Sequence, residues 1–206
     1  MKLLLTSFWT SPAQDQELIK LVGKEQKDIK VAYIENAFDI YDDEASLIEG
    51  RKILQEKGFD FEVVDLRKFR DDHEGLKKIL ESKDVYWFTG GNGFYLRSLM
   101  KDTGADEMII NEVKKGKVYV GASGGAVIAG PTMKHFDNQD DPKEAREIIW
   151  EGLGLTDIVP VPHVDNPDFG KGCREAGELC AKDGYKTIEY TDSQALLIDG
   201  NIQRII

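Results

Sequence analysis

The chain has 206 residues, of which 41% are hydrophobic and 32% charged, a composition typical of a globular protein and not of a disordered one. Its formal net charge of −11 disfavours phosphate-bearing partners, so we expect neither nucleic acid nor a membrane surface as a partner. The apolar run at the N-terminus is shorter than the roughly seven residues of a signal-peptide core, and none approaches the ~18 that span a bilayer. We therefore expect a cytoplasmic protein with one domain over residues 1–206.

Strand-like apolar runs alternate with helical stretches through most of the chain. The runs predicted as strands are residues 2–8, 29–35, 61–66, 85–89, 118–122 and 158–162. Helical periodicity with charged outer faces covers residues 13–27, 43–57, 74–82 and 106–115. Continuous apolar runs suit strands that are buried on both faces, so the alternation predicts an α/β fold with a mostly parallel twisted sheet and helices on both faces.

The end of the chain follows a different pattern. Residues 186–190, 195–198 and 202–206 are short strand-like runs, and Asp199-Gly200-Asn201 predicts a tight turn between the last two. We expect a C-terminal β-hairpin there. Cys173 and Cys180 lie two helical turns apart, too far for a disulfide, and are expected to be reduced core residues. No His or Cys spacing suggests a metal site, and no cofactor motif is present.

The most informative segment is Gly121-Ala122-Ser123-Gly124-Gly125, which joins a predicted buried strand to a helix of small residues. This is the G-x-S-x-G pattern of a nucleophile elbow in the context that it requires. The chain turns so sharply that Cβ atoms two residues on either side of the serine would collide, hence the glycines. Ser123 is therefore the candidate nucleophile. The alternative is a glycine turn that only joins the strand to the helix or binds a phosphate.

A serine nucleophile needs a base, and the chain has three histidines. His73 lies among charged residues at a helix start, and His135 follows Ser123 by only twelve residues. His163 emerges at the carboxyl end of the predicted strand 158–162, the edge where sites assemble in open α/β sheets. We therefore predict His163 as the base.

An acidic residue should orient this histidine. Spacing alone does not choose between Asp165, Asp192 and the cluster Asp137, Asp140 and Asp141, although Asp141 has an alternative role as a helix N-cap before Pro142.

Backbone N–H groups are needed for the oxyanion of a hydrolytic intermediate. The N–H of Gly124, next to the serine, is one candidate. The second candidate source is Thr89-Gly90-Gly91-Asn92-Gly93, a glycine turn after the predicted strand 85–89. A phosphate-binding turn is the alternative interpretation, but the segment lacks the lysine of a P-loop and the spacing of a dinucleotide fingerprint.

With these motifs the chain resembles the peptidase E and cyanophycinase family of serine peptidases, related in fold to class I glutamine amidotransferases and so flavodoxin-like. The resemblance covers most of the chain and includes the segments 1–7, 88–92, 121–126, 131–132 and 162–163. Family members usually carry alanine where this chain has Gly124, a departure that should leave the backbone donor in place but make the turn more flexible.

The resemblance implies Ser123 as nucleophile, His163 as base, and Gly91 with Gly124 as oxyanion donors. It favours Asp192 as the third member of the triad, where the family commonly has glutamate; the shorter aspartate predicts a longer contact to His163 or a shift of the backbone. Asp137 and Asp140 lie near another acidic position of the family and are the second choices.

Peptidase E removes an N-terminal aspartate from dipeptides and uses a basic residue to hold the substrate carboxylate. Arg174 lies near the corresponding place, and Asn92 of the glycine turn is a further candidate for substrate binding.

The leading hypothesis is a serine hydrolase that cleaves small peptides, a peptidase E-like dipeptidase, through an acyl-enzyme. Two alternatives are an esterase of the α/β-hydrolase type and a non-catalytic binding protein with the same fold. An esterase of that type places its histidine after the acid and near the C-terminus, whereas no histidine follows His163 here. The oligomeric state stays open, with a homodimer as the default.

Overall fold

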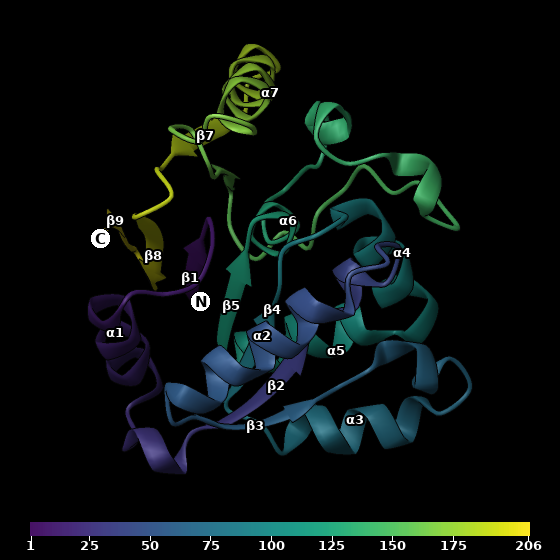
Figure 1. Cartoon of the computed structure of the whole chain (residues 1–206), viewed down its shortest axis with the longest axis vertical. Helices are drawn as coiled ribbons and strands as arrows, with labels where there is room; N and C mark the ends of the chain where they lie inside the picture. Colours follow the sequence, from purple (N-terminus) through teal and green to yellow (C-terminus); the bar gives the residue numbers. More distant parts are fainter.

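The computed structural model describes all 206 residues, and its central feature is a seven-stranded twisted sheet (Figure 1). The strand order is β3-β2-β4-β5-β1-β8-β9. The first five strands are parallel, whereas β8 and β9 are antiparallel to their neighbours. The strands of this sheet are β1 (Lys2–Thr6), β2 (Lys30–Ile34), β3 (Asp60–Val63), β4 (Val85–Phe88), β5 (Val118–Ala122), β8 (Ala195–Asp199) and β9 (Ile202–Ile205). The predicted mostly parallel α/β fold is confirmed.

Helices cover both faces of the sheet, as predicted. The helices are α1 (Pro12–Val22), α2 (Glu44–Glu56), α3 (His73–Glu81), α4 (Gly93–Thr103), α5 (Ala105–Lys114), α6 (Gly124–Val127) and α7 (Gly170–Lys182). Leu18 of α1 and Leu54 of α2 belong to one hydrophobic cluster. Leu76 of α3 and Leu99 of α4 belong to the larger cluster on the other face. Two cores therefore enclose the sheet.

The inner strands contribute to both cores because successive side chains of a strand point to opposite faces. In β1, Leu3 and Leu5 join the larger cluster and Leu4 joins the smaller one, and all three are fully buried. This explains why the inner strands are continuous apolar runs without polar alternation.

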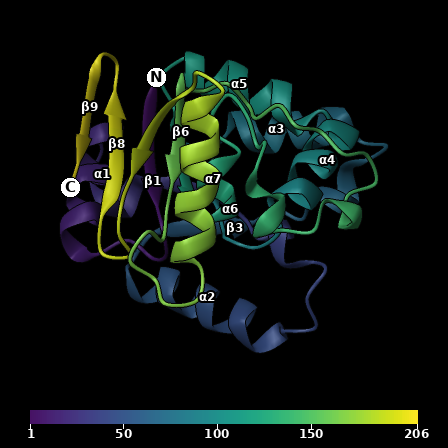
Figure 2. The same ribbon diagram turned by 90° about the horizontal axis from the view of Figure 1, so that it is seen from above.

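One predicted strand lies outside the main sheet. Residues 158–162 form β6 (Ile158–Val161), which pairs in parallel with β7 (Lys186–Glu189) in a separate two-stranded sheet. Helix α7 connects the two strands and packs on them, as Figure 2 shows. The edge of the parallel block at β1 is not open to β6, because β1 pairs with β8 on the side away from β5.

Two helices also differ from the sequence prediction. Helix α1 ends at Val22 and not at residue 27, because Gly23 adopts a left-handed conformation with φ 76° and closes the helix. Helix α4 was not predicted. It begins after Asn92, whose side chain accepts a hydrogen bond from the Tyr95 N–H, and ends at the left-handed Gly104.

The C-terminal hairpin is confirmed: β8 and β9 are antiparallel, and Figure 2 shows the C-terminus on the outermost strand. Cys173 and Cys180 are both buried free thiols, as predicted. None of the helices has the length and the apolar character that crossing a membrane requires.

Candidate active site

Ser123 lies at the turn between β5 and α6, with φ 49° and ψ −118°. A positive φ is unfavourable for a residue with a Cβ and persists only where the surrounding structure enforces it. Such strain is a property of the nucleophile elbow, in which the turn projects the serine hydroxyl away from the sheet. Ser123 N donates a hydrogen bond to the carbonyl of Thr6 at 2.9 Å, which fixes the turn to the end of β1.

Close packing of the backbone leaves little room for a Cβ at the glycines around the serine in this chain. A Cβ at position 121 would lie 2.3 Å from the carbonyl oxygen of Gly125, and one at Gly125 would lie 2.7 Å from the carbonyl oxygen of Thr89. A Cβ at position 124 would lie 2.3 Å from the carbonyl oxygen of Gly91. The absence of a Cβ at Gly124 therefore lets the turn pack directly against the Gly91 segment.

His163 follows β6 and has a φ of 63°. Its backbone N–H donates a hydrogen bond to Ser7 Oγ at 2.9 Å, and the Ser7 hydroxyl donates to the carbonyl of Thr191 at 3.1 Å. Ser7 comes directly after β1, so its hydroxyl links the main sheet to the segments that carry His163 and Asp192. These contacts bring the small sheet to the carboxyl end of the main one.

Asp192 is the acid that contacts the histidine. His163 Nδ1 lies 2.7 Å from Asp192 Oδ1, and Asn166 Nδ2 donates to Asp192 Oδ2 at 2.7 Å. The backbone N–H of Asp192 donates to Asp165 Oδ1 at 2.8 Å. Aspartate therefore reaches the ring at an ordinary hydrogen-bond distance, and the longer contact expected from its shorter side chain is not observed.

The imidazole of His163 is nearly fully buried between two aromatic rings. The Phe8 ring meets it edge-on with centroids 4.5 Å apart, and the Phe169 ring lies 5.3 Å away. Desolvation by this burial lowers the pKa of His163 below 6.5, and hydrogen bonding and charge from Asp192 oppose the shift. The ring is therefore neutral at pH 7, the form in which a histidine accepts a proton.

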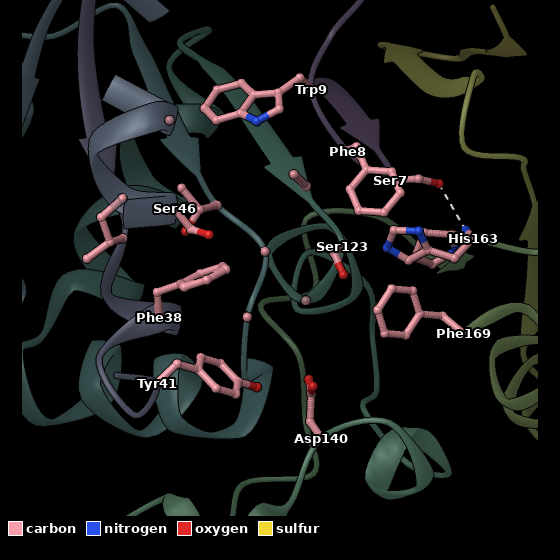
Figure 3. A pocket seen from close by; sticks show the side chains of 18 of the residues that line it. Ser7, Phe8, Trp9, Phe38, Tyr41, Ser46, Ser123, Asp140, His163 and Phe169 are labelled. Atoms are coloured by element: carbon pink, nitrogen blue, oxygen red, sulfur yellow. Dashed lines mark hydrogen bonds between the residues drawn. The ribbon is translucent and has the colours of Figure 1, made fainter. Parts of the chain in front are cut away.

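Ser123 and His163 line the same cavity of about 750 Å³. Figure 3 shows the Ser123 hydroxyl at the centre of this cavity, with the His163 ring beside it and Phe169 below the ring. No hydrogen bond joins the two side chains in this structure. Catalytic hydrogen bonds are often long in ligand-free sites and tighten when substrate binds.

Two backbone segments present N–H groups beside the serine. Gly124 is the first residue of α6, where N–H groups have no partner within the helix. The N–H groups of Gly90 and Gly91 make no hydrogen bond in the structure, and both residues line the cavity. Gly91 has a φ of 113°, and a Cβ there would lie 2.5 Å from the carbonyl oxygen of Ala37, so the position requires glycine.

Four further residues that were predicted at the site make no hydrogen bond with Ser123 or His163. The Asn92 side chain donates to the carbonyl of Asp141 and caps α4, so it does not line the cavity. Arg174 is exposed and donates to the carbonyl of Val164. Asp137 is exposed and also lies outside the cavity. Asp140 lines the cavity but contacts Gly93, not His163.

The other two histidines lie outside the cavity. His73 Nε2 contacts the carbonyl of Arg70, and His135 Nε2 pairs with Asp183 at 2.9 Å. No group of three or more His, Cys, Asp or Glu side chains has the geometry to hold a metal ion.

Sequence reasoning missed several residues that hold the site. Ser7 and Phe8 follow β1 directly, and their position at the carboxyl end of a central strand was a usable signal. Phe169 and Asn166 lie in the loop between β6 and α7. No local pattern distinguishes them, because their contacts depend on how the small sheet packs against the large one.

The sequence of this chain is similar to a known family of peptidases. The model of peptidase family S51 matches residues 3–206. An uncharacterised peptidase of Listeria innocua is 36% identical over 123 residues, which cover 59% of this chain and 58% of that protein. A peptidase E of Nostoc is 29% identical over 116 residues, covering 56% of this chain and 44% of that protein. The aligned segments thus span about half of each curated relative.

Solved structures extend the similarity to the whole chain. A crystal structure described as a putative peptidase E from Listeria monocytogenes superposes with a TM-score of 0.84 at 26% identity, over 100% of this chain and 97% of that chain. A peptidase from an acI-B1 actinobacterium shares the fold, with a TM-score of 0.73 at 17% identity over 100% of this chain and 86% of that one. The chain therefore belongs to peptidase family S51.

Proposed function

We propose that the chain is a serine peptidase that hydrolyses short peptides, dipeptides among them, through an acyl-enzyme on Ser123. The observation that carries this proposal is that His163, whose Nδ1 lies 2.7 Å from Asp192 Oδ1, lines the same cavity as the strained Ser123. Membership of a peptidase family supplies the class of reaction. The cavity of about 750 Å³ has the size of a small-molecule site and suits a short peptide better than a folded protein.

In the first half of the reaction, Ser123 Oγ attacks the peptide carbonyl and His163 Nε2 accepts the hydroxyl proton. Asp192 accepts a hydrogen bond from Nδ1–H, which leaves Nε2 free to accept the proton and stabilises the imidazolium that forms. The N–H groups of Gly91 and Gly124 donate to the oxyanion. The C–N bond then breaks, and the amine leaves with the proton from His163.

In the second half, His163 Nε2 accepts a proton from water, whose oxygen attacks the acyl carbon on Ser123. The same two N–H groups stabilise the second oxyanion. The ester bond breaks, His163 returns the proton to Ser123 Oγ, and the acid product leaves. One peptide bond and one water are consumed in each cycle, and the protein returns to its starting state.

The contact between His163 and Asp192 argues against the esterase alternative. An α/β-hydrolase follows the chain order serine, acid, histidine. Here the acid in contact with the histidine is Asp192, which follows His163 in the chain. Ester hydrolysis by the same residues is a side reaction that the chemistry permits, because the acyl-enzyme is the same.

Hydrolysis of a panel of dipeptides, followed by the amino acids released, tests the proposal. Ser123→Ala and His163→Gln should each lower kcat/KM by at least about 10³-fold, because each removes a group that acts in the transition state. His135→Gln is the matched control, since His135 pairs with Asp183 outside the cavity, and should leave the rate unchanged. Equal turnover by Ser123→Ala and the wild type would refute the proposal. Absence of turnover by folded wild-type protein would favour a binding protein.

A further inference from the structure

Besides His163, one other side chain forms a hydrogen bond with the Asp192 carboxylate, and this is Asn166. Its Nδ2 donates to Asp192 Oδ2 at 2.7 Å, while the other oxygen, Oδ1, lies 2.7 Å from His163 Nδ1. A carboxylate that is held at one oxygen can still rotate about its Cβ–Cγ bond, because that torsion has only a broad minimum. The second hydrogen bond therefore fixes the plane in which Asp192 meets the imidazole.

The orientation of the Asn166 amide follows from its other contacts. Asn166 Oδ1 accepts hydrogen bonds from the backbone N–H groups of Asp168 and Phe169, at 2.9 and 3.1 Å. Two donors face this end of the amide, and an ionised carboxylate, which only accepts, faces the other end. The reverse orientation would place donors against donors and oxygen against oxygen. The amide nitrogen is thus committed to Asp192.

The backbone of Asn166 is tied to the base as well. Its N–H donates to the carbonyl of His163 at 2.9 Å, and its carbonyl accepts from the N–H of Gly170, the first residue of α7, at 2.9 Å. The Phe169 ring, whose N–H the Asn166 side chain accepts, lies 5.3 Å from the imidazole. One residue therefore links the base, the acid and an aromatic wall of the site.

Asp192 lies outside the strands on either side of it, so its position depends on such contacts. It follows β7 and precedes β8, in a turn between them. Asp165 Oδ1 accepts its backbone N–H at 2.8 Å, and Asn166 holds its carboxylate. Residues 165 and 166 thus hold the acid at both its backbone and its side chain.

We propose that Asn166 is a positioning residue of the proposed triad, whose amide holds the Asp192 carboxylate where it accepts the Nδ1–H of His163. The proposal rests on the function proposed above and adds a fourth residue to that site. Asn166 does not line the cavity, so it acts through Asp192 and not on the substrate. Loss of its N–H donor should therefore lower kcat and leave KM nearly unchanged.

Asn166→Asp tests the donor with the smallest change of shape. The variant keeps the oxygen that accepts from Asp168 and Phe169, but it replaces the donor by a second carboxylate beside Asp192. Two adjacent carboxylates share a proton only at acid pH, so rates are compared at about pH 8, where both are ionised. We expect kcat for dipeptide hydrolysis to fall by about 10–100-fold, because a displacement of about 1 Å misorients the catalytic groups.

Asn138→Asp is the matched control. Asn138 Nδ2 donates to the carbonyl of Gly172 in α7 at 2.9 Å, and Asn138 lies outside the cavity. The same change from amide to acid should leave kcat unchanged there. A wild-type kcat in Asn166→Asp would overturn the inference.

The reciprocal exchange separates positioning from a general effect on the fold. In Asp192→Asn, the new amide can donate to the carboxylate that Asn166→Asp introduces, so the hydrogen bond forms again with the roles reversed. In this background, Asn166→Asp should cost less than about 3-fold in kcat, since the two positions act as one unit. An equal loss in both backgrounds would show that Asn166 supports only the fold, and would overturn the inference.

The Nδ1–H proton of His163 supplies a readout that needs no turnover. Because this proton lies in a 2.7 Å contact with Asp192, it should give a far-downfield proton NMR signal in the wild type and in Asn138→Asp. The signal should be lost in Asp192→Asn and in Asn166→Asp. A signal that persists in Asn166→Asp, or that is absent from the wild type, would overturn the inference. If the wild type hydrolyses no dipeptide but its signal is present and is lost in Asn166→Asp, the proposed function alone is refuted.

Discussion

Substitution of Gly124 by alanine should damage both the stability and the activity of the protein. The added Cβ would lie 2.3 Å from the carbonyl oxygen of Gly91, whereas ordinary contacts begin at 3.4 Å, so the two segments must separate by about 1.1 Å. Overpacking of this kind costs about 1–3 kcal/mol, and the lower entropy of the unfolded alanine chain returns about 0.4–1 kcal/mol. The net loss in the free energy of unfolding should be about 1.3 kcal/mol at the midpoints of these ranges and at most about 2.6 kcal/mol.

The effect on activity should be larger than the effect on stability. Gly124 and Gly91 carry the two proposed oxyanion donors, and a misplacement of about 1 Å in a catalytic group can cost on the order of 100-fold in rate. We therefore expect Gly124→Ala to lower kcat/KM by about 10²-fold while the protein remains folded. Urea denaturation and dipeptide hydrolysis measure the two quantities.

Gly152→Ala is the matched control for this variant. Its Cβ would lie 2.2 Å from the carbonyl oxygen of Gly130, a backbone collision of the same kind, but Gly152 does not line the cavity. It should lose a similar amount of stability without a loss of kcat/KM. If Gly124→Ala were more stable than the wild type and equally active, the tight packing of the elbow against Gly91 would be refuted.

Three further predictions concern the groups around His163 and the cavity. Asp192→Asn should lower kcat by about 10³–10⁴-fold, because the amide no longer stabilises the imidazolium, and a loss below 10-fold would argue against its role. A plot of log kcat/KM against pH should fall on the acid side with a midpoint below 6.5, since burial lowers the pKa of His163. Phe8→Ala should shift this midpoint upward, because it exposes the imidazole to water. A wild-type midpoint above 7 would contradict the burial argument. Asp140 has a raised pKa of about 6 in the fold against 3.8 for a free aspartate, so the folded state binds more protons between these values and its stability should decrease as the pH rises through this window. Asp140→Asn should remove that decrease and gain about 1–3 kcal/mol in the free energy of unfolding at pH 7, and an identical pH dependence of urea denaturation in both proteins would count against the assigned pKa.

The sequence allowed the parallel sheet to be predicted because its strands are continuous apolar runs buried on both faces. Leu3, Leu4 and Leu5 all lie in cores, so no polar alternation was needed to find the strand. The sequence did not predict the partner of β6. The apolar run that contains Val159 and Pro160 indicates a strand but not which strand it pairs with, and in the structure β8 takes the place beside β1 while β6 pairs with β7.

The elbow could be predicted because its G-x-S-x-G pattern between a strand and a helix is a local feature of the sequence. Contacts between distant segments were harder to predict. Asn92 follows a strand within a glycine turn, so it suggested substrate binding, yet its side chain caps α4 and reaches Asp141. An asparagine at this position can bind a substrate or cap the next helix, and which of the two it does depends on the direction in which that helix leaves the turn.

The composition of the cavity also lay beyond sequence reasoning. Arg174 was a reasonable candidate for a substrate carboxylate because the resemblance to peptidase E implies a basic residue near its position. The structure places its guanidinium on the carbonyl of Val164, outside the cavity. Which charges face a pocket depends on rotamers and on neighbours such as Glu35, which pairs with Arg51.

Covalent labelling with a fluorophosphonate probe tests the central claim most directly. Intact-mass analysis and peptide mapping should find one adduct, on Ser123, formed at least about 10³-fold more slowly in His163→Gln and at the wild-type rate in His135→Gln. An adduct on another serine, or none on folded wild-type protein, would contradict the account of Ser123 as a nucleophile activated by His163.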